Sequence, residues 1–275
     1  MKKFEGILIC TDLDGTLLNE ERRVSKENLE AIRYFQREGG FFTFVTGRPY
    51  YNAEEIYHTV LPNAPVGCFN GGAIYDFSTG SYLHLQELSY DALELVKCVE
   101  RELPSVGIVL VTPEKDFFVR DTDLTRKLFY LSQPREIVSC DSFSKPLVKV
   151  ILAEEDPVCM EALISLLQNH ARKDEFDFIR SEETLYEILP KGVNKGEVLP
   201  RLCEILKLDP KKTIAVGDYD NDVAMIATAG IGIAVENAVP AAKAVADLVT
   251  VSNEEHAIAR IIHDLDSGAL QFFEN

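Results

Sequence analysis

The chain has 275 residues, of which 46% are hydrophobic, so it is long enough for one large domain or two moderate ones with well-formed cores. Its net charge of −17 argues against nucleic acid and anionic membranes as partners, because both are bound by clustered positive charge. The six cysteines form no CxxC pair and no apolar run approaches the ~18 residues of a membrane span, so we expect a cytoplasmic protein without a zinc or dithiol site.

The first part of the chain alternates short apolar strands with amphipathic helices. Ser25 is the expected N-cap of the first helix, and Gly39 with Gly40 marks its end. Such alternation predicts a parallel sheet with helices on its faces. The predicted strands are 7–11, 41–45 and 66–69, and the predicted helices are 26–38 and 54–60.

A different pattern begins near residue 77, where the polar turn 76–81 is predicted to join two hairpin strands. From residue 84 to residue 188, short strands mix with two longer helical patterns, which indicates an inserted α+β domain. The predicted helices are 90–102 and 158–170, and the predicted strands are 106–111, 117–119, 148–152, 176–179 and 184–188.

Alternation of strands and helices resumes after Pro190. Pro200 is compatible with a helix because it lies near the first turn. We therefore expect one domain made of 1–83 and 189–275, with a second domain, 84–188, inserted into it. The predicted strands of this last part are 213–216, 232–235 and 248–250, and the predicted helices are 196–206, 223–229 and 254–265.

Polar clusters follow three of the predicted parallel strands. Asp12 and Asp14 follow the first strand, Thr46-Gly47-Arg48 follows the second, and the acidic stretch 217–222 follows a strand of the last part. Parallel strands end at one edge of a sheet, where ligands bind in open α/β folds, so we expect the clusters to meet there. A fourth cluster, Asn194-Lys195-Gly196, lies where a helix begins and adds a positive charge.

Asp12 and Asp14 have the spacing of two carboxylates that point to the same side of an extended segment. Such carboxylates repel one another unless a cation lies between them or one is protonated. A carboxylate can attack phosphorus and form an aspartyl phosphate, so Asp12 is the candidate nucleophile and Asp14 the candidate general acid and base. Asp218, Asp12 and the main-chain oxygen of Asp14 would supply the oxygen ligands that Mg²⁺ prefers.

The other clusters contain donors for a phosphoryl group. The Thr46 hydroxyl, the Gly47 N–H and the Lys195 ammonium are expected to bind its oxygens as charge shifts during the reaction. Asn221 lies near the start of a predicted helix, whose free N–H groups favour an anion. Arg48 has two interpretations, because it either contacts phosphate or pairs with an acid that holds the turn.

Each cluster taken alone also fits an ordinary structural role. Turns favour Asp, Gly and Thr, so 11–16 and 46–49 could each be a turn that only ends a strand or enters a helix. Lys195 alone could be a solvated lysine, and 217–222 a solvated acidic loop. A calcium loop of the EF-hand type is excluded, because its twelfth residue would be Ala229 instead of glutamate.

Taken together, the motifs resemble those of the haloacid dehalogenase superfamily. Four stretches look like the motifs of that superfamily: DLDGTLL at 12–18, VTGR at 45–48, the lysine of VNKG at 195, and GDYDND at 217–222. The resemblance implies roles for five residues: Asp12 as nucleophile, Asp14 as acid and base, Thr46 and Lys195 as catalytic residues, and Asp218 as metal ligand. It also implies that the Leu13 N–H and the Asn221 side chain contact the phosphate.

The long insertion between the second and third motifs resembles the cap of the Cof-type (type IIB) phosphatases. NGG at 70–72 and AGIGIAVENA at 229–238 are further features similar to that subfamily. The resemblance implies an α/β fold with a Rossmann-like core on a parallel sheet and an inserted α+β cap of the C2 type. Four further residues are candidates for the site: Arg48, Asn70, Asn194 and Asp222.

We therefore predict a phosphatase that hydrolyses a small phosphate monoester with Mg²⁺ through an aspartyl phosphate on Asp12. Its substrate would be a small phosphorylated metabolite, either a sugar phosphate or a phosphorylated cofactor or nucleotide, and the chain would be a monomer or homodimer. The cap would close over the leaving group and select it. Cap candidates for this task, each of which could also be ordinary surface charge, are Arg120, Asp121, Lys145 and Arg180.

Two alternatives to hydrolysis remain. A phosphomutase shares the first half of the mechanism but passes the phosphoryl group to a sugar hydroxyl instead of water. A non-catalytic sensor would bind a phosphorylated metabolite without turnover. An intact set of acid, nucleophile, lysine and metal ligand speaks against the sensor, because binding alone does not need an acid and base beside a nucleophile.

Overall fold

The computed structural model describes residues 2–129 and 135–272, and within them the chain forms two compact units. The first unit contains the segments up to Leu85 and from Asn194 onward, and the second contains Gln86–Val193. The sequence pattern predicts these boundaries at 83/84 and 188/189. The second boundary lies later in the structure because the last strand of the inserted unit, β10 (Leu185–Pro190), continues past the predicted end.

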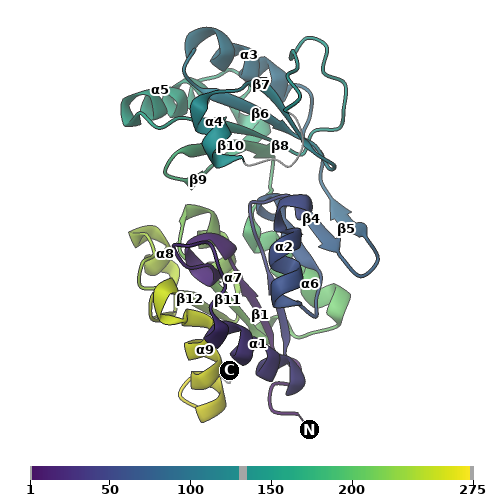
Figure 1. The fold of residues 1–275 in the computed structure, drawn as a ribbon, viewed down its shortest axis with the longest axis vertical. Helices are drawn as coiled ribbons and strands as arrows, with labels where there is room; N and C mark the ends of the chain where they lie inside the picture. Colours follow the sequence, from purple (N-terminus) through teal and green to yellow (C-terminus); the bar gives the residue numbers. More distant parts are fainter. Residues whose placement is uncertain (1, 130–134, 273–275) are drawn as a thin grey trace. The chain divides into compact units, whose positions relative to one another are not determined.

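The first unit is built on a five-stranded parallel sheet with the order β13-β12-β11-β1-β2 (Figure 1). β1 lies between β11 and the edge strand β2, so Cys10 pairs with Ala215 of β11 on one side and with Thr43 of β2 on the other. Every residue of β1 is buried, as expected for a parallel strand covered on both faces. The predicted parallel sheet is confirmed, and its strands are β1 (Leu8–Thr11), β2 (Phe41–Phe44), β11 (Thr213–Gly217), β12 (Ile231–Ala234) and β13 (Leu248–Val249).

Helices flank this sheet (Figure 1). Ser25 caps the first helix as predicted, because its hydroxyl accepts a hydrogen bond from the Asn28 N–H at 3.2 Å. The Asn28 side chain accepts in turn from the Ala259 N–H at 2.9 Å, so the first and last helices are tied together. The helices are α1 (Lys26–Arg37), α2 (Tyr50–Val60), α6 (Val198–Leu206), α7 (Val223–Thr228), α8 (Pro240–Val245) and α9 (Ala257–Ser267).

Three of these helices differ most from the prediction, and the others differ by at most two residues at one end. α2 begins at Tyr50, one turn before Glu54, because Pro49 has the extended conformation of an N-cap. α8 is absent from the prediction because six residues are too few to give a clear helical period. α9 begins later than predicted, at Ala257, because residues 253–255 form a separate turn.

A three-stranded antiparallel sheet follows β2 and α2, with strands β3 (Val66–Cys68), β4 (Ala73–Asp76) and β5 (Ser81–Leu85). The turn between β4 and β5 is the predicted one, and the Gly80 N–H donates to the Asp76 carbonyl at 2.8 Å. β3 ends one residue earlier than predicted, because Phe69 has a left-handed φ of 53° that a strand cannot accommodate.

Within its described residues, the inserted unit is an antiparallel five-stranded sheet with the order β7-β6-β8-β10-β9, accompanied by three α-helices. α4 is absent from the prediction, and it is fixed by a reciprocal pair of hydrogen bonds between Thr122 and Thr125. The elements of this unit are β6 (Gly107–Val111), β7 (Asp116–Arg120), β8 (Lys149–Ala153), β9 (Phe176–Glu182), β10, α3 (Ala92–Glu102), α4 (Asp123–Leu128) and α5 (Pro157–Gln168).

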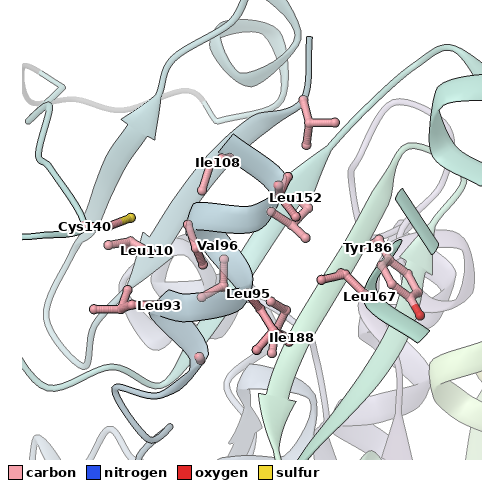
Figure 2. Packing of buried hydrophobic residues seen from close by; sticks show 14 of the residues in the cluster. Leu93, Leu95, Val96, Ile108, Leu110, Cys140, Leu152, Leu167, Tyr186 and Ile188 are labelled. Atoms are coloured by element: carbon pink, nitrogen blue, oxygen red, sulfur yellow. The ribbon is translucent and has the colours of Figure 1, made fainter. Parts of the chain in front are cut away.

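The core of the inserted unit lies between its sheet and its long helices (Figure 2). Val96 of α3 points toward Ile108 and Leu110 of β6, and all three side chains are fully buried. Leu167 of α5 packs near Tyr186 of β10 in the same cluster. No helix in the described part of the chain is both long and apolar enough to span a membrane.

Gly71 offers a direct test of packing between two distant segments of the first unit. It has φ 96°, and a Cβ atom there would lie 2.1 Å from the carbonyl oxygen of Asn194. We expect Gly71→Ala to lower the free energy of unfolding by about 3 kcal/mol or more, because left-handed strain and overlap with the main chain add. Urea unfolding of the full chain measures this loss.

Gly80→Ala is the matched control for that substitution. Its φ is 65°, but the nearest atom to a new Cβ is the Tyr75 hydroxyl at 4.0 Å. Only the strain remains, so the expected loss is about 1–2 kcal/mol. Equal losses at the two positions would contradict the close packing of Gly71 on Asn194.

Candidate active site

Asp12 lies directly after strand β1 and is 6% exposed. Its N–H donates to the Val216 carbonyl at 2.8 Å, which continues the pairing of β1 with β11 by one residue. The fully buried Lys195 reaches the same point, and its Nζ donates to Asp12 Oδ1 at 2.6 Å. Two residues 183 positions apart in the chain therefore form a buried ion pair at the carboxyl end of the sheet.

Asp222 is the second partner of Lys195, and its side chain also holds the main chain of the loop that follows β11. Lys195 Nζ donates to Asp222 Oδ1 at 2.7 Å. The other oxygen, Oδ2, accepts from the N–H groups of Asp218 at 2.9 Å and Tyr219 at 3.1 Å. Gly217 makes this possible, because a Cβ there would lie 2.4 Å from the Cβ of Asp222.

Asp218 completes a group of three carboxylates. Its Oδ1 accepts from the Thr16 hydroxyl at 2.7 Å. Its Oδ2 would lie only 2.4 Å from a Cβ at Gly15, where φ is 80°, so this turn requires glycine for both conformation and space. One oxygen each from Asp12, Asp218 and Asp222 lies within 4.8 Å of the others.

The electrostatics of this group favour a cation. Burial raises the pKa of Asp12 well above its ordinary value, Lys195 opposes this shift, and the charges of Asp222 and Asp218 add to it. Burial and the Asp222 charge also raise the pKa of Asp218 to about 7, against the hydrogen bond from Thr16. The carboxylates of Asp12, Asp218 and Asp222 outnumber the one positive charge near them, that of Lys195, and every ligand atom they offer is an oxygen. The residues therefore fit a hard divalent cation such as Mg²⁺.

Asp14 is held apart from these three carboxylates by Arg48. Arg48 Nε donates to Asp14 Oδ2 at 2.8 Å and Nη2 donates to Oδ1 at 2.5 Å, which is a bidentate pair. Of the two interpretations of Arg48, the structure therefore favours pairing with an acid. The Asp14 side chain is outside the group of close carboxylates found among the described residues, whereas Asp222 is inside it.

Thr46 and Gly47 follow β2 at the same edge of the sheet. Thr46 is 1% exposed, and its hydroxyl oxygen accepts from the Arg48 N–H at 3.2 Å, which leaves the hydroxyl proton to donate elsewhere. A Cβ at Gly47 would lie 2.9 Å from Asn70 Oδ1, so Asn70 packs against the main chain of this loop.

The remaining predicted residues lie around this centre in structural contacts. Asn221 Nδ2 donates to Asn70 Oδ1 at 3.0 Å. Asn194 Oδ1 accepts from the Gly196 N–H at 2.9 Å and so starts the turn that contains Lys195. Leu13 is fully buried, and its carbonyl accepts from the Leu18 N–H at 2.8 Å.

Sequence reasoning missed two residues that shape the site. Thr16 holds Asp218, and Asn237 Nδ2 donates to the Gly15 carbonyl at 2.8 Å. Thr16 lies within the first motif, DLDGTLL, so its closeness in sequence to Asp12 and Asp14 indicates that it belongs to the site. Asn237 lies within the quoted stretch 229–238, but it is 222 residues from its partner, and that stretch alone does not indicate the contact.

The cap candidates make contacts within the inserted unit that explain them structurally. Arg120 donates to the carbonyls of Glu100, Leu103 and Val106, and so fixes the end of α3. Three further candidates also have local partners: Asp121 pairs with Arg126 and Arg135, Arg180 donates to the Glu183 carbonyl, and Lys145 lies over the Phe117 ring. These contacts favour the interpretation of all four as structural residues.

A family model for haloacid dehalogenase-like hydrolases matches residues 9–262, a range that contains all four polar clusters. The chain belongs to this family. The prediction that the chain is a hydrolase is therefore confirmed. The predicted fold class and the resemblance to the haloacid dehalogenase superfamily are confirmed as well.

Relatives of known name match the chain over nearly its whole length. The phosphatase YwpJ of Bacillus subtilis is 29% identical over 283 residues, which cover 94% of this chain and 99% of YwpJ. YitU of the same organism, a 5-amino-6-(5-phospho-D-ribitylamino)uracil phosphatase, is 26% identical over 264 residues, covering 94% of this chain and 96% of YitU.

A solved structure of a sugar phosphatase from subclass IIB of the superfamily has the same fold. It superposes on this chain with a TM-score of 0.81, and the match covers 96% of this chain and 100% of the chain of that structure. Its sequence is 19% identical, so the likeness concerns the fold.

The raised pKa of Asp218 predicts how pH affects the stability of the metal-free protein. Its ordinary value is 3.8 and its value in the fold is about 7, so between these values the folded state holds a proton that the unfolded state has lost. The free energy of unfolding therefore falls as pH rises through this window, by up to about 4 kcal/mol. We expect Asp218→Asn to flatten this slope in urea unfolding measured from pH 4 to pH 8.

Metal binding gives a second measurement on the same variant. Mg²⁺ should raise the melting temperature of the unaltered protein at pH 7.5 and have much less effect on Asp218→Asn. Asp220→Asn is the matched control, because Asp220 is exposed in the same loop. Identical pH slopes and identical Mg²⁺ responses in all three proteins would contradict the assignment of Asp218.

Proposed function

We propose that this chain is a Mg²⁺-dependent phosphatase that hydrolyses a small phosphate monoester through an aspartyl phosphate on Asp12. The observation that supports it best is the buried pairing of Asp12 with Lys195 at 2.6 Å, beside two further carboxylates at the end of the parallel sheet. The names of the relatives support phosphate ester hydrolysis in particular.

The first step transfers the phosphoryl group to Asp12. Lys195 occupies Oδ1 of Asp12, so we assign the attack on phosphorus to Oδ2. A bond forms between this oxygen and phosphorus, and the bond from phosphorus to the ester oxygen breaks. Asp14 donates its proton to the departing alcohol, which leaves as a neutral molecule.

The second step releases phosphate. Asp14, now a carboxylate, takes a proton from a water molecule that attacks phosphorus. The bond between phosphorus and Asp12 breaks, the Asp12 carboxylate is restored and inorganic phosphate leaves. Arg48 donates to both oxygens of Asp14 in this structure, so this pair must open before Asp14 can carry the proton that it donates in the first step.

The surrounding residues neutralise the phosphoryl oxygens. Lys195 is positively charged, because its two carboxylate partners and their hydrogen bonds raise its pKa although burial alone would lower it. The Thr46 hydroxyl and the main-chain N–H groups of Leu13 and Gly47 would donate to the same oxygens. Mg²⁺ would be held by Asp12, Asp218 and the main-chain oxygen of Asp14, and it would offset the surplus negative charge of the site.

The inserted unit, Gln86–Val193, is proposed as the cap that selects the leaving group. Substrates of the right class are alcohols of moderate size that carry one terminal phosphate, such as a sugar phosphate or a ribityl phosphate, the kind of ester named for YitU. We propose a cytoplasmic setting, in which such metabolites occur.

Asp12→Asn tests the nucleophile. We expect kcat to fall by about 10⁴-fold or more while the far-ultraviolet circular dichroism is unchanged, because Lys195 keeps Asp222 as a partner. Rapid acid quench of the unaltered enzyme with a phosphate ester should leave one phosphoryl group on the peptide that contains Asp12. Mass spectrometry of that peptide detects it, and hydroxylamine should remove it.

Asp123→Asn is the control for this experiment, because the Asp123 side chain is fully exposed and lies outside the four polar clusters. It should retain full activity. An Asp12→Asn protein with substantial turnover, or a phosphoryl group found on another residue, would overturn the nucleophile. Inorganic phosphate as the product indicates hydrolysis, whereas an isomerised phosphosugar would indicate a mutase.

Asp14→Asn tests the acid and base. We expect a loss of about 10²–10⁴-fold in kcat with an alkyl phosphate, because its alkoxide leaves poorly without a proton. With an aryl phosphate, whose phenolate leaves unaided, the first step should be nearly normal and phosphorylated enzyme should accumulate. Pre-steady-state release of the phenol measures this. Equal losses of both steps with both esters would argue against the assignment.

A further inference from the structure

The turn after β1 is bonded to the last part of the chain at two points. Residues 13–17 form this turn, and Gly15 within it has φ 80° and ψ −4°. Glycine has more conformational freedom than any other residue, so contacts with neighbouring groups are needed to keep the turn in one conformation. Two bonds from residues 222 and 235 positions away supply them: Asn237 Nδ2 donates to the Gly15 carbonyl at 2.8 Å, and Asn253 Nδ2 donates to the Leu18 carbonyl at 2.9 Å.

The two asparagines are also bonded to each other. The Asn253 N–H donates to Asn237 Oδ1 at 3.1 Å. Both ends of the Asn237 amide therefore meet main-chain groups, a carbonyl that only accepts and an N–H that only donates, which fixes the orientation of the amide. Asn253 is itself held in place, because it is 9% exposed and lies in the turn 253–255, where the Ser252 hydroxyl donates to Glu255 Oε2 at 2.9 Å.

The segment that carries Asn237 also contacts the loop after β11. The Val239 N–H donates to the Asp218 carbonyl at 2.8 Å. Within three residues, this segment thus bonds to the main chain of the candidate metal ligand and, through the Asn237 side chain, to the turn that contains Asp14. Asn237 therefore helps to fix where this turn lies relative to the loop of Asp218.

Asp14 is the candidate catalytic residue that depends most on this support. Its carboxylate is paired with Arg48, and the pair must open before Asp14 can carry a proton. Once the pair is open, the direction of the Asp14 side chain follows from the main chain of the turn, in which the next residue is a glycine. A displacement of about 1 Å in a catalytic group can lower a rate by about 100-fold.

We propose that Asn237 is a positioning residue for proton transfer by Asp14. By fixing the Gly15 carbonyl, it keeps the turn 13–17 in the conformation from which Asp14 reaches the ester oxygen, and Asn253 supports it by holding its amide. Asn237 acts through Asp14 and does not itself touch the substrate. The proposal rests on the proposed function, since it requires Asp14 to be the acid of the first step.

Asn237→Ala removes the bond to Gly15, and two esters at saturating Mg²⁺ test the effect. With an alkyl phosphate, phosphoryl transfer to the enzyme should slow by about tenfold to hundredfold, because the alkoxide needs the proton of Asp14. With an aryl phosphate it should slow by less than about twofold, because phenolate leaves unaided. Rapid acid quench measures the first rate, and pre-steady-state release of the phenol measures the second.

A double variant tests whether the effect passes through Asp14. When Asn237→Ala is combined with Asp14→Asn, the rate with the alkyl phosphate should equal that of Asp14→Asn alone within about twofold. The acid through which Asn237 acts is then absent, so its position no longer matters.

Asn63→Ala is the matched control. Asn63 is exposed like Asn237, and its amide also joins two main-chain groups, since Nδ2 donates to the Gly40 carbonyl at 3.0 Å and Oδ1 accepts from the Phe42 N–H at 2.8 Å. These groups lie at the start of β2, at the opposite end of the sheet from the candidate site. Asn63→Ala should lower the urea midpoint about as much as Asn237→Ala but leave both rates within about twofold.

Hydrogen exchange gives a measurement that needs neither substrate nor metal. In Asn237→Ala without Mg²⁺, the main-chain amides of 13–18 should exchange about tenfold faster, because the turn opens more often, whereas Asn63→Ala should leave them unchanged. Asn237→Asp separates the bond from the shape of the side chain, because a carboxylate still accepts from the Asn253 N–H but cannot donate to Gly15. It should slow the alkyl phosphate reaction at least as much as Asn237→Ala.

The outcomes distinguish this inference from the function beneath it. Equal slowing with both esters, unchanged rates or unchanged exchange in Asn237→Ala would overturn the role of Asn237 even if the enzyme hydrolyses esters normally. Losses that multiply in the double variant would overturn it as well. If Asp14→Asn itself shows no difference between the two esters, or if the unaltered protein turns over neither, both the proposed function and the role of Asn237 are refuted.

Discussion

The candidate site depends on one buried ammonium. Lys195 is fully excluded from solvent, and a buried charge is tolerated only when it is paired and hydrogen-bonded. Its two bonds join Asp12, at the end of β1, to Asp222, which holds the main chain of the loop after β11. The candidate nucleophile and the loop of the candidate metal ligand are therefore fixed by the same charge.

The same centre explains how an acidic protein can attract an anion. The chain has a net charge of −17, yet its site combines Lys195 with carboxylates whose surplus charge suits a divalent cation. Charges this close need main-chain segments that approach one another, and Gly15 and Gly217 allow this because a Cβ at either position would overlap an aspartate. Gly15 of the first motif and Gly217 of the fourth thus allow the charged groups to lie close together, in addition to forming the turns.

Much of this arrangement followed from local sequence patterns. Short apolar runs that alternate with helices predicted the parallel sheet, and the ends of parallel strands meet at one edge, so Asp12, Thr46 and the acidic loop were expected together. The short helices α4 and α8 were missed, because six residues give little periodic signal. Element ends shifted where a left-handed residue, such as Phe69, ended a strand that its apolar side chain would have continued.

The sequence by itself indicated the kind of chemistry, because the residue types at the strand ends, taken together, suit phosphoryl transfer. Only the tertiary structure decided the partners. Thr16 bonds to Asp218 across 202 residues, Arg48 pairs with Asp14, and Asn70 reaches Asn221 across 151 residues. Such contacts depend on which strands are neighbours and on how closely their loops pack, and no local pattern of residues contains that information.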